Sequence, residues 1–252
     1  MIKLAQAADV FFFGELHNDP IGHWLEQDIL RDLVDKKGKK RVVAGAEMFE
    51  RHQQKGLTQY LTGAIEEKEF VDSTGTWPNY KTDYRPVVEY CKEQEIPFIA
   101  TNVPRRYARK VAIEGPASLD TLPEVEKRLM TPLPFEIDYT LPSYVAIKEM
   151  MGGHGHGMNM DNFIAAQAVK DATMAHFILE NWKKGQLFYH LNGSYHSDSK
   201  EGIAWYLTQA KPEITIVNLT VVKQSDLGKV EDEHLGKADI IIVVPERMAT
   251  SY

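Results

Sequence analysis

Residues 9–17 read DVFFFGELH, an apolar run that ends abruptly in a glycine, a carboxylate and an imidazole. Apolar side chains on successive residues, rather than on alternate ones, are typical of a parallel strand that is covered on both faces. Polar residues directly after such a strand lie at the carboxyl edge of the sheet, where open α/β proteins form their sites. This stretch therefore predicts both a fold class and the place of a functional site.

Five further segments share this apolar character and are expected to form strands. They are Arg41–Met48, Ile96–Asn102, Gln186–Asn192, Glu213–Leu219 and Ala238–Val244. Apolar residues recur with helical spacing in the segments between them. These expected helices are Pro20–Asp35, Tyr84–Gln94, Pro104–Glu114 and Ser199–Gln209. The alternation predicts an α/β protein with a mostly parallel open sheet flanked by helices.

The alternation breaks between residues 115 and 182. This segment holds five prolines, the run MMGGHGHGM at residues 150–158, and a helical pattern from about Asn159 to Trp182. We expect residues 115–182 to form a helical cap. The cap would be inserted into an α/β core domain made of residues 1–114 and 183–252.

Charge and composition exclude several classes of function. The chain carries 29 lysines and arginines against 36 aspartates and glutamates, a formal net charge of −7, so nucleic acid is not an expected partner. The basic residues 36–41 are interpreted as a solvated loop. The longest apolar runs are too short to cross a bilayer. Nucleotide binding is disfavoured because no phosphate loop and no G-x-G-x-x-G after a strand occurs.

Charged side chains follow four of the expected strands: Glu15 and His17, then Glu47, then Arg105, and finally His196. Glu15 and His17 are two residues apart, so their side chains point the same way in extended backbone. The two carboxylates and two imidazoles make an oxygen and nitrogen set suited to a divalent metal ion. The alternative is a hydrogen-bonded network that fastens the strand ends. We favour a site, because charged groups at a buried edge must pair or bind something.

The expected long helix places Gln167, Asp171 and Met174 on one face. We interpret them as outer contacts that orient the strand-end side chains, with a solvent-facing stripe as the alternative. His154 and His156, flanked by methionines, could bind a soft metal or line a haem pocket; a mobile lid is an equal alternative. Four other histidines are interpreted as ordinary packed or solvated residues: His23, His52, His190 and His234.

Taken in order, these motifs resemble the ChaN family of haem-binding uptake proteins. The matching stretches are residues 8–17 with Pro20 and His23, residues 45–51, residues 102–106 with Gly115, residues 167–175, and residues 192–198. The resemblance covers about residues 8–219. Each motif alone is weak, but five of them in the right order make a specific signal.

The resemblance implies a haem-binding protein of bacterial iron acquisition, in which haem lies at a homodimer interface. It also implies a tyrosine ligand to the iron and basic side chains near the propionates, and a phenolate suits ferric haem. We expect the haem contacts in the cap, among Tyr144, Lys148, His154 and His156. Tyr144 is the expected iron ligand, with Tyr195 as the second choice.

The same family implies a lipoprotein of the bacterial cell envelope, on its periplasmic side. No signal-peptide pattern follows Met1, which leads almost directly into the first expected strand. Attachment to a membrane would therefore require a lipid anchor on a native leader that has been removed.

The strand-end pattern also resembles a wider superfamily that includes the Tiki proteases and the erythromycin esterases. There, a G-E-x-H motif and a later histidine belong to a hydrolytic site. This implies catalytic roles for Glu15, His17, Glu47, Arg105 and His196. A carboxylate or histidine would activate water, and Arg105 would steady the developing oxyanion. A metal-dependent hydrolase is thus the alternative function, and a purely structural partner-binding domain ranks last.

Overall fold

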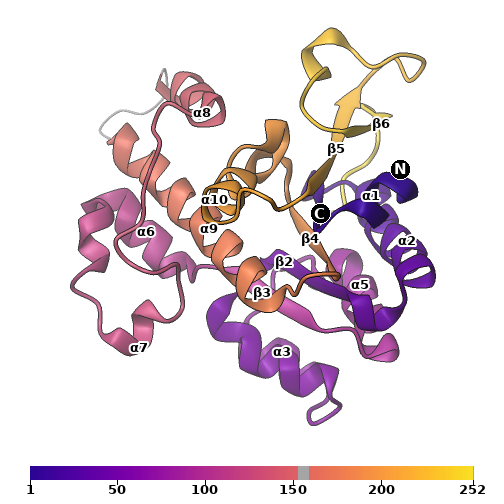
Figure 1. Cartoon of the computed structure of the whole chain (residues 1–252), viewed down its shortest axis with the longest axis horizontal. Coiled ribbons are helices and arrows are strands. Elements are labelled where there is room, and N and C mark those ends of the chain that lie inside the picture. Colours follow the sequence, from indigo (N-terminus) through magenta and orange to yellow (C-terminus); the bar gives the residue numbers. More distant parts are fainter. Residues whose placement is uncertain (153–158, 252) are drawn as a thin grey trace.

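The computed structural model describes residues 1–152 and 159–251. Its centre is a six-stranded sheet in the order β3-β2-β4-β1-β5-β6, in which all neighbouring strands pair in parallel (Figure 1). The strands are β1 (Val10–Glu15), β2 (Val42–Glu50), β3 (Phe98–Asn102), β4 (Leu187–Gly193), β5 (Ile216–Gln224) and β6 (Ile240–Pro245). Each expected strand overlaps one of these, and the predicted α/β fold with a parallel open sheet is confirmed.

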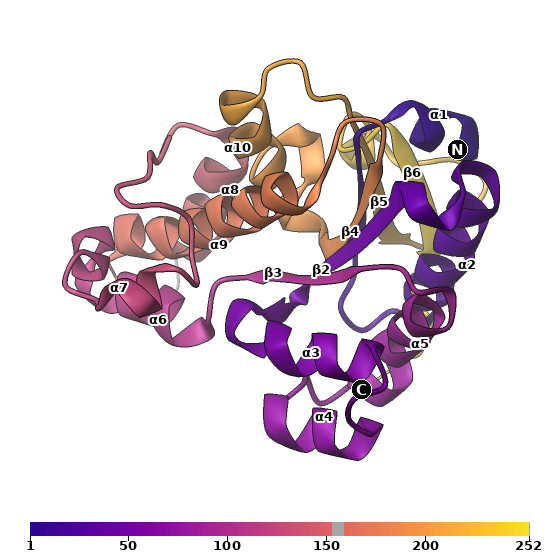
Figure 2. The ribbon, with the colours of Figure 1, turned by 60° about the horizontal axis from the view of Figure 1, so that its bottom comes forward.

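Two layers of helices cover the sheet. One face is covered by α1 (Ile2–Ala7), α2 (Pro20–Lys37), α3 (Gln54–Leu61), α4 (Glu67–Thr74) and α5 (Arg85–Gln94). The other face packs against α9 (Met160–Asn181) and α10 (Ile203–Ala210), and Figure 2 shows α9 and α3 on opposite sides of the strands. Phe11 and Phe13 of β1 belong to the first core, whereas Val10 and Phe12 belong to the second. Successive apolar residues are therefore all buried, as the sequence predicts.

The segment after β3 contains α6 (Arg105–Glu114), α7 (Glu124–Lys127), α8 (Pro142–Gly152) and the long helix α9. These helices gather at one side of the molecule in Figure 1. The first half of α9 packs on α6 and α8, but its second half covers the sheet, where Met174 and Ile178 belong to the same apolar core as Val10 and Phe12. Helix α9 thus packs against both the expected cap and the expected core domain. The division of the chain into these two domains stays a prediction.

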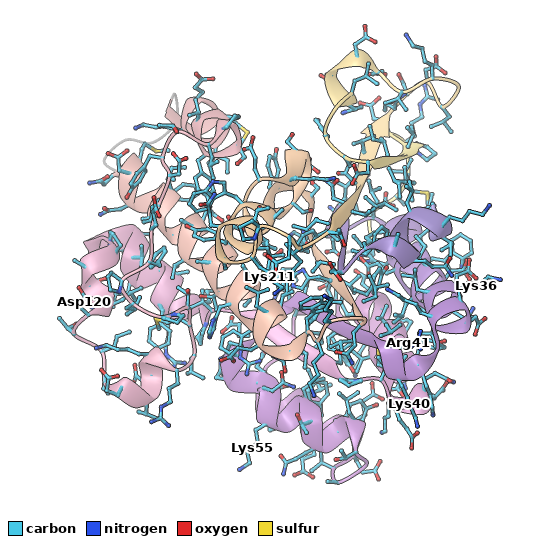
Figure 3. The ribbon with its side chains drawn as sticks, in the orientation of Figure 1. Lys36, Lys40, Arg41, Lys55, Asp120 and Lys211 are labelled. Carbon is cyan, nitrogen blue, oxygen red and sulfur yellow. The ribbon has the colours of Figure 1, made fainter. Side chains whose placement is uncertain are left out.

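Short turns complete the connections. They are 3₁₀ turns at Lys39–Arg41, Arg51–Gln53, Pro116–Leu119, Ser194–His196, Asp198–Lys200 and Asp232–His234, and a π turn at Tyr80–Tyr84. The labelled Lys36, Lys40 and Arg41 lie at the periphery of the molecule (Figure 3), and all three are exposed. No helix in the described ranges has the length and apolar character that a membrane span requires.

The register brings the carboxyl ends of the strands to one edge. Glu15 at the end of β1 pairs with Gly193 at the end of β4. The ladder between β2 and β4 stops at the pair Ala46 and Leu191, and the ladder between β2 and β3 is irregular after Ala46. The last residues of β2 are therefore released from regular pairing beside the end of β4.

The centre of the sheet requires a glycine on β2. A Cβ atom at Gly45 would lie 2.8 Å from the ring of Phe188 and 3.0 Å from the carbonyl oxygen of Ile99. We expect Gly45→Ala to lower the free energy of unfolding by about 1–3 kcal/mol, because the added methyl overpacks the interface with β4. Denaturant unfolding measures this change.

The matched control is Gly22→Ala in α2, where the nearest atom to the added Cβ is 3.7 Å away. We expect it to leave the free energy of unfolding unchanged or to raise it by up to about 1 kcal/mol, since alanine favours helix. Equal losses in the two variants would contradict this packing argument.

Candidate functional site

A chain of four buried side chains links the helices after β3 to the sheet edge. The hydroxyl of Tyr144 on α8 donates to Asp171 Oδ2 of α9 at 2.7 Å. His196 Nδ1 lies 2.5 Å from Asp171 Oδ1, and its Nε2 lies 3.2 Å from Glu47 Oε1. His196 comes from the turn directly after β4, and Glu47 comes from the irregular end of β2. Four segments that are distant in sequence therefore meet in one network.

The imidazole of His17 lies beside this network, next to the backbone of Gly193 at the end of β4. The second oxygen of Glu47, Oε2, accepts a hydrogen bond of 2.8 Å from the backbone N–H of Gly193. A Cβ atom at Gly193 would lie 2.8 Å from His17 Nε2 and 3.5 Å from Glu47 Oε2. A side chain at this position would therefore displace the imidazole of His17, whereas the carboxylate of Glu47 would be in ordinary contact with it.

Glu15 holds His17 in place. Its Oε1 accepts from the hydroxyl of Tyr84 at 2.8 Å and lies 2.6 Å from His17 Nδ1. The other side of the imidazole packs edge to face on Trp77, with ring centroids 5.1 Å apart. The side chain of His17 remains 37% exposed, whereas that of Glu15 is fully buried. His17 is thus the member of the cluster that solvent reaches.

Opposite charges in the network stabilise one another and shift the pKa values of its members. Burial disfavours the charged form of His196, but the carboxylates of Glu47 and Asp171 outweigh it and raise the pKa of His196 to about 10. Burial alone would raise the pKa of Glu47, yet His196 holds it below its usual range. For His17, the hydrogen bond to Glu15 and the charge of Glu47 outweigh burial and raise its pKa. At neutral pH, His196 is therefore a buried imidazolium between two carboxylates.

The other expected members of the cluster lie elsewhere. Arg105 is exposed at the first position of α6, and within the described residues it has no hydrogen bond or ion pair to the cluster. Arg105 begins α6, which packs on α9, and β2 separates β3 from β4, the strand before His196. Among the three residues on the long helix, only Asp171 contacts the cluster: Met174 is core, and Gln167 accepts from Lys170 Nζ at 3.4 Å.

The expected haem contacts divide into buried and exposed side chains. Tyr144 is 2% exposed, and burial beside Asp171 raises its pKa well above the usual value, so its phenolate is disfavoured. Tyr195 is 64% exposed. Lys148 is exposed and pairs with Asp161 at 2.8 Å. His154 and His156 lie outside the described residues.

A cleft of about 390 Å³ lies at the carboxyl edge beside Tyr195. Its lining comes from the turns after β1 and β4, from the start of α8, from the end of β5 and from the segment before β6. It combines Lys223 and Lys237 with apolar side chains that include Leu16 and Ala146. The expected haem contacts, four in the cap and Tyr195 outside it, did not include these two lysines, which no motif in the sequence marks.

A second buried group lies beneath the cluster, between β1 and α2. His23 Nδ1 is 3.5 Å from Glu15 Oε2 and 3.5 Å from Glu26 Oε1. His23 is thus a packed histidine, as the sequence predicts, but its two carboxyl neighbours were not expected, and Glu26 went unnoticed. Burial opposes the charge on His23, but the two carboxyl groups raise its pKa to about 11. Burial, and then the charge of Glu15, raise the pKa of Glu26.

A comparison with models of known protein families shows to which family this chain belongs. The family model described as haem-binding uptake, Tiki superfamily, ChaN matches residues 1–207. The chain belongs to the ChaN family. The resemblance noted in the sequence motifs is thereby confirmed, and a haem-binding role is supported for this ChaN-family protein.

Two solved structures share the fold of this ChaN-family protein, and one further protein is similar to part of its sequence. The structure of ChaN of Campylobacter jejuni, described as showing cofacial heme binding, has a TM-score of 0.70 and 18% identity, covering 96% of this chain and 89% of that one. A mutant of the erythromycin esterase EreC in its open conformation has a TM-score of 0.52 and 11% identity, covering 94% and 76%. The chloroplastic protein RETICULATA-RELATED 5 of Arabidopsis thaliana is 26% identical over 130 residues, which are 50% of this chain and 17% of that protein.

The pKa of His196 predicts how stability depends on pH in this ChaN-family protein. A folded-state pKa of about 10, raised from 6.5, means that the ion pairs stabilise the fold fully below pH 6.5 and are lost as pH rises through 10. We expect Asp171→Asn to cost about 3–5 kcal/mol at neutral pH, because it breaks a buried pair. The deficit should shrink as pH rises toward the folded-state pKa of His196, as measured by denaturant unfolding.

The control is Asp161→Asn on the same helix, whose partner Lys148 is exposed. We expect this variant to change the free energy of unfolding by less than about 1 kcal/mol at any pH. Histidine NMR titration of the wild type supplies the second readout. A His196 signal that titrates near pH 6.5 would contradict the prediction.

Proposed function

We propose that this protein binds haem as part of bacterial iron acquisition, with the carboxyl-edge cleft as the haem site. The observation that carries the proposal is an exposed tyrosine, Tyr195, at the rim of a cleft that also contains two lysines. Membership of the haem-binding ChaN family supports the ligand class. The residues of the cleft support its place in the molecule.

Tyr195 is the proposed iron ligand. It follows β4 in a tight turn, and its exposed hydroxyl has no hydrogen-bond partner among the described residues. A phenolate is a suitable axial ligand for ferric haem, as in catalase. Tyr144 fits the role less well, because its hydroxyl is buried and already donates to Asp171. To ligate haem, Tyr144 would have to leave the network that holds His196.

The cleft has the composition that a haem edge requires. Lys223 and Lys237 supply positive charge for the two propionates, and Leu16, Ala146 and Val222 supply apolar contacts for the macrocycle. Lys223 is 3.7 Å from Asp19 Oδ2, a distance that leaves its ammonium available for a second anion. The volume of about 390 Å³ is in the range of about 300–1,000 Å³ that is usual for small-molecule sites.

A second copy of the chain is the proposed cover for the haem. A planar ligand on an exposed tyrosine leaves its other face in water, and burying that face against a symmetric copy removes apolar area from solvent. The ChaN of Campylobacter jejuni is described as binding heme cofacially, which fits such an arrangement. We therefore propose a homodimer with haem at the interface, held at the cell envelope by a lipid anchor on a native leader.

A haem titration of two tyrosine variants tests the ligand. We expect Tyr195→Phe to abolish the shifted Soret band of ferric haem and the dimer formation that accompanies it, because the iron loses its anionic ligand. Tyr144→Phe is the matched control and should keep the wild-type spectrum, losing about 1 kcal/mol of stability with its buried hydrogen bond. Absorbance and size in solution are the measurements.

The reverse pattern, a spectrum lost in Tyr144→Phe and kept in Tyr195→Phe, would assign the iron to the buried tyrosine. A wild-type spectrum identical to that of free haem would remove the proposed function itself.

Hydrolysis is the second candidate function. It would occur at the cluster of Glu15, His17, Glu47 and His196, here called the strand-end cluster. The specific observation is an acid and a base side by side at a solvent-reached position: the imidazolium of His196 and the carboxylate of Glu47 lie next to the exposed His17. A water molecule at His17 would find a proton acceptor in Glu47 and a proton donor in His196. Tyr195 and His196 are neighbours on opposite sides of one turn, so haem binding and hydrolysis are compatible.

A metal ion fits less well among these four side chains than the sequence predicts. In the described ranges, three convergent ligand atoms within 4.8 Å of one another are offered by Glu15, His23 and Glu26, whereas His17, Glu47 and His196 form no such group. The hydrolytic alternative therefore rests on acid and base side chains. A divalent metal ion held by Glu15, His17, Glu47 and His196 remains a proposal within this alternative.

A hydrolase screen with two histidine variants tests the alternative. We expect His17→Ala, like Glu15→Gln, to abolish hydrolysis of ester or peptide substrates while leaving the haem spectrum intact. His52→Ala is the matched control, because its side chain is 38% exposed against 37% for His17. Rates are compared with and without Mn²⁺. Equal rates in all variants, or none in the wild type, would exclude a hydrolytic role for the cluster.

A further inference from the structure

The buried group of Glu15, His23 and Glu26, here called the β1–α2 group, carries an inference that the haem site does not require. We propose that it binds one divalent first-row metal ion, of the Zn²⁺ or Mn²⁺ type, which fastens α2 to the end of β1. The site uses neither His17, Glu47 nor His196. It is therefore distinct from the strand-end cluster, with which it shares only the carboxyl group of Glu15.

The spacing of the ligand atoms fits a metal better than it fits hydrogen bonds. His23 Nδ1 is 3.5 Å from Glu15 Oε2 and 3.5 Å from Glu26 Oε1. Hydrogen bonds between such groups are normally about 2.7–3.2 Å long. Ligands at about 2.0–2.1 Å from a tetrahedral ion are themselves separated by about 3.4 Å, which is close to the observed spacing.

The same atoms are buried and form no hydrogen bond among the described residues, although His23 Nδ1 is 3.5 Å from each carboxyl group. Glu15, His23 and Glu26 are 1%, 4% and 0% exposed. Within the described part of the chain, Glu15 Oε2, His23 Nδ1 and both carboxyl oxygens of Glu26 lack a hydrogen bond. Buried polar atoms are normally satisfied, and buried carboxylates are paired or coordinate metals. A divalent cation would displace the protons of His23 Nδ1 and Glu26 to solvent, satisfy the ligand atoms and balance the two carboxylate charges.

The surroundings orient the imidazole as a metal ligand. His23 Nε2 lies 3.3 Å from the backbone carbonyl oxygen of His17, which accepts its N–H, and 3.4 Å from Asp83 Oδ2, so Nδ1 is left facing Glu15 and Glu26. Asp83 Oδ2 is itself held by Asn79 Nδ2 and Ser251 Oγ, each at 2.7 Å. A metal-binding histidine almost always donates its other N–H to such an acceptor.

A cleft gives an ion access to the β1–α2 group from the surface, and a bound ion would also affect the orientation of His17. A cleft of about 170 Å³ reaches His23 and Asp83 from the surface, lined also by Trp24 and Gln27. Glu15 uses Oε2 toward the proposed ion and Oε1 toward His17. An ion in the β1–α2 group would therefore fix the carboxylate that orients His17. Carboxylate and imidazole ligands without thiolate favour Zn²⁺ or Mn²⁺ over soft metals.

Metal titration of the full chain tests the proposal. The protein is stripped with EDTA, then titrated with Co²⁺ as an absorbing probe and with Zn²⁺ and Mn²⁺, and its metal content is measured after gel filtration. We expect one retained equivalent, visible d–d bands with Co²⁺, and a Tm that rises with Zn²⁺. Glu26→Gln should weaken binding by roughly 100-fold or more, since it removes a ligand and a charge.

Two further variants place the ion. Glu233→Gln is the matched control, because the exposed Glu231 and Glu233 and the buried His234 form the other convergent group among the described residues. It should leave binding unchanged. Glu47→Gln tests the strand-end cluster. Loss of metal in either of these variants, with Glu26→Gln still binding, would overturn the proposal.

The wild type alone also decides the question if a variant fails to fold. Absence of Co²⁺ bands, of retained metal and of a Zn²⁺-dependent Tm would show that protons alone neutralise the group. In that case Glu26→Gln would be neutral or stabilising, as for many buried ion clusters. These outcomes leave haem binding at Tyr195 untouched, so the two proposals fail separately.

Discussion

The ion pairs of His196 with Glu47 and Asp171 are the constraint on which the arrangement of this protein depends. Burying three charged side chains is tolerable only if they are paired with good geometry. The pairing fixes α9 against the end of β4 and fixes β4 against the end of β2. Tyr144 then attaches α8 to the same network. The helices that close over the sheet edge are thus held by electrostatics as well as by apolar packing.

The turn after β4 gives neighbouring residues opposite environments. The side chain of Tyr195 faces solvent at the cleft, whereas His196 is turned inward to two carboxylates. A ligand that binds the phenol ring of Tyr195 and moves this turn would also change the distances between His196 and its two carboxylate partners. The exposed side chain of Tyr195 and the buried imidazolium of His196 are therefore mechanically connected through one peptide unit.

The strands, most helices and the core of the site could be predicted from the sequence, because parallel strands deliver their carboxyl ends to one edge whatever their order. Strand order itself leaves no local pattern, so Arg105 was expected in a cluster that it does not reach. The roles of Tyr144 and Tyr195 depend on which way each side chain faces after packing. His23 and Glu26 lie among apolar residues of α2, where a buried polar pair resembles ordinary helix periodicity.

The central place of β4 also sets the order in which the chain can fold. β1 and β2 do not pair with each other, because residues 187–193 lie between them. A ribosome that has made the first two strands must synthesise the chain to residue 193 before β4 can join them. Until then, two apolar strands expose open edges, the kind of surface that chaperones cover and that aggregates recruit. The sheet of this protein is completed late in synthesis.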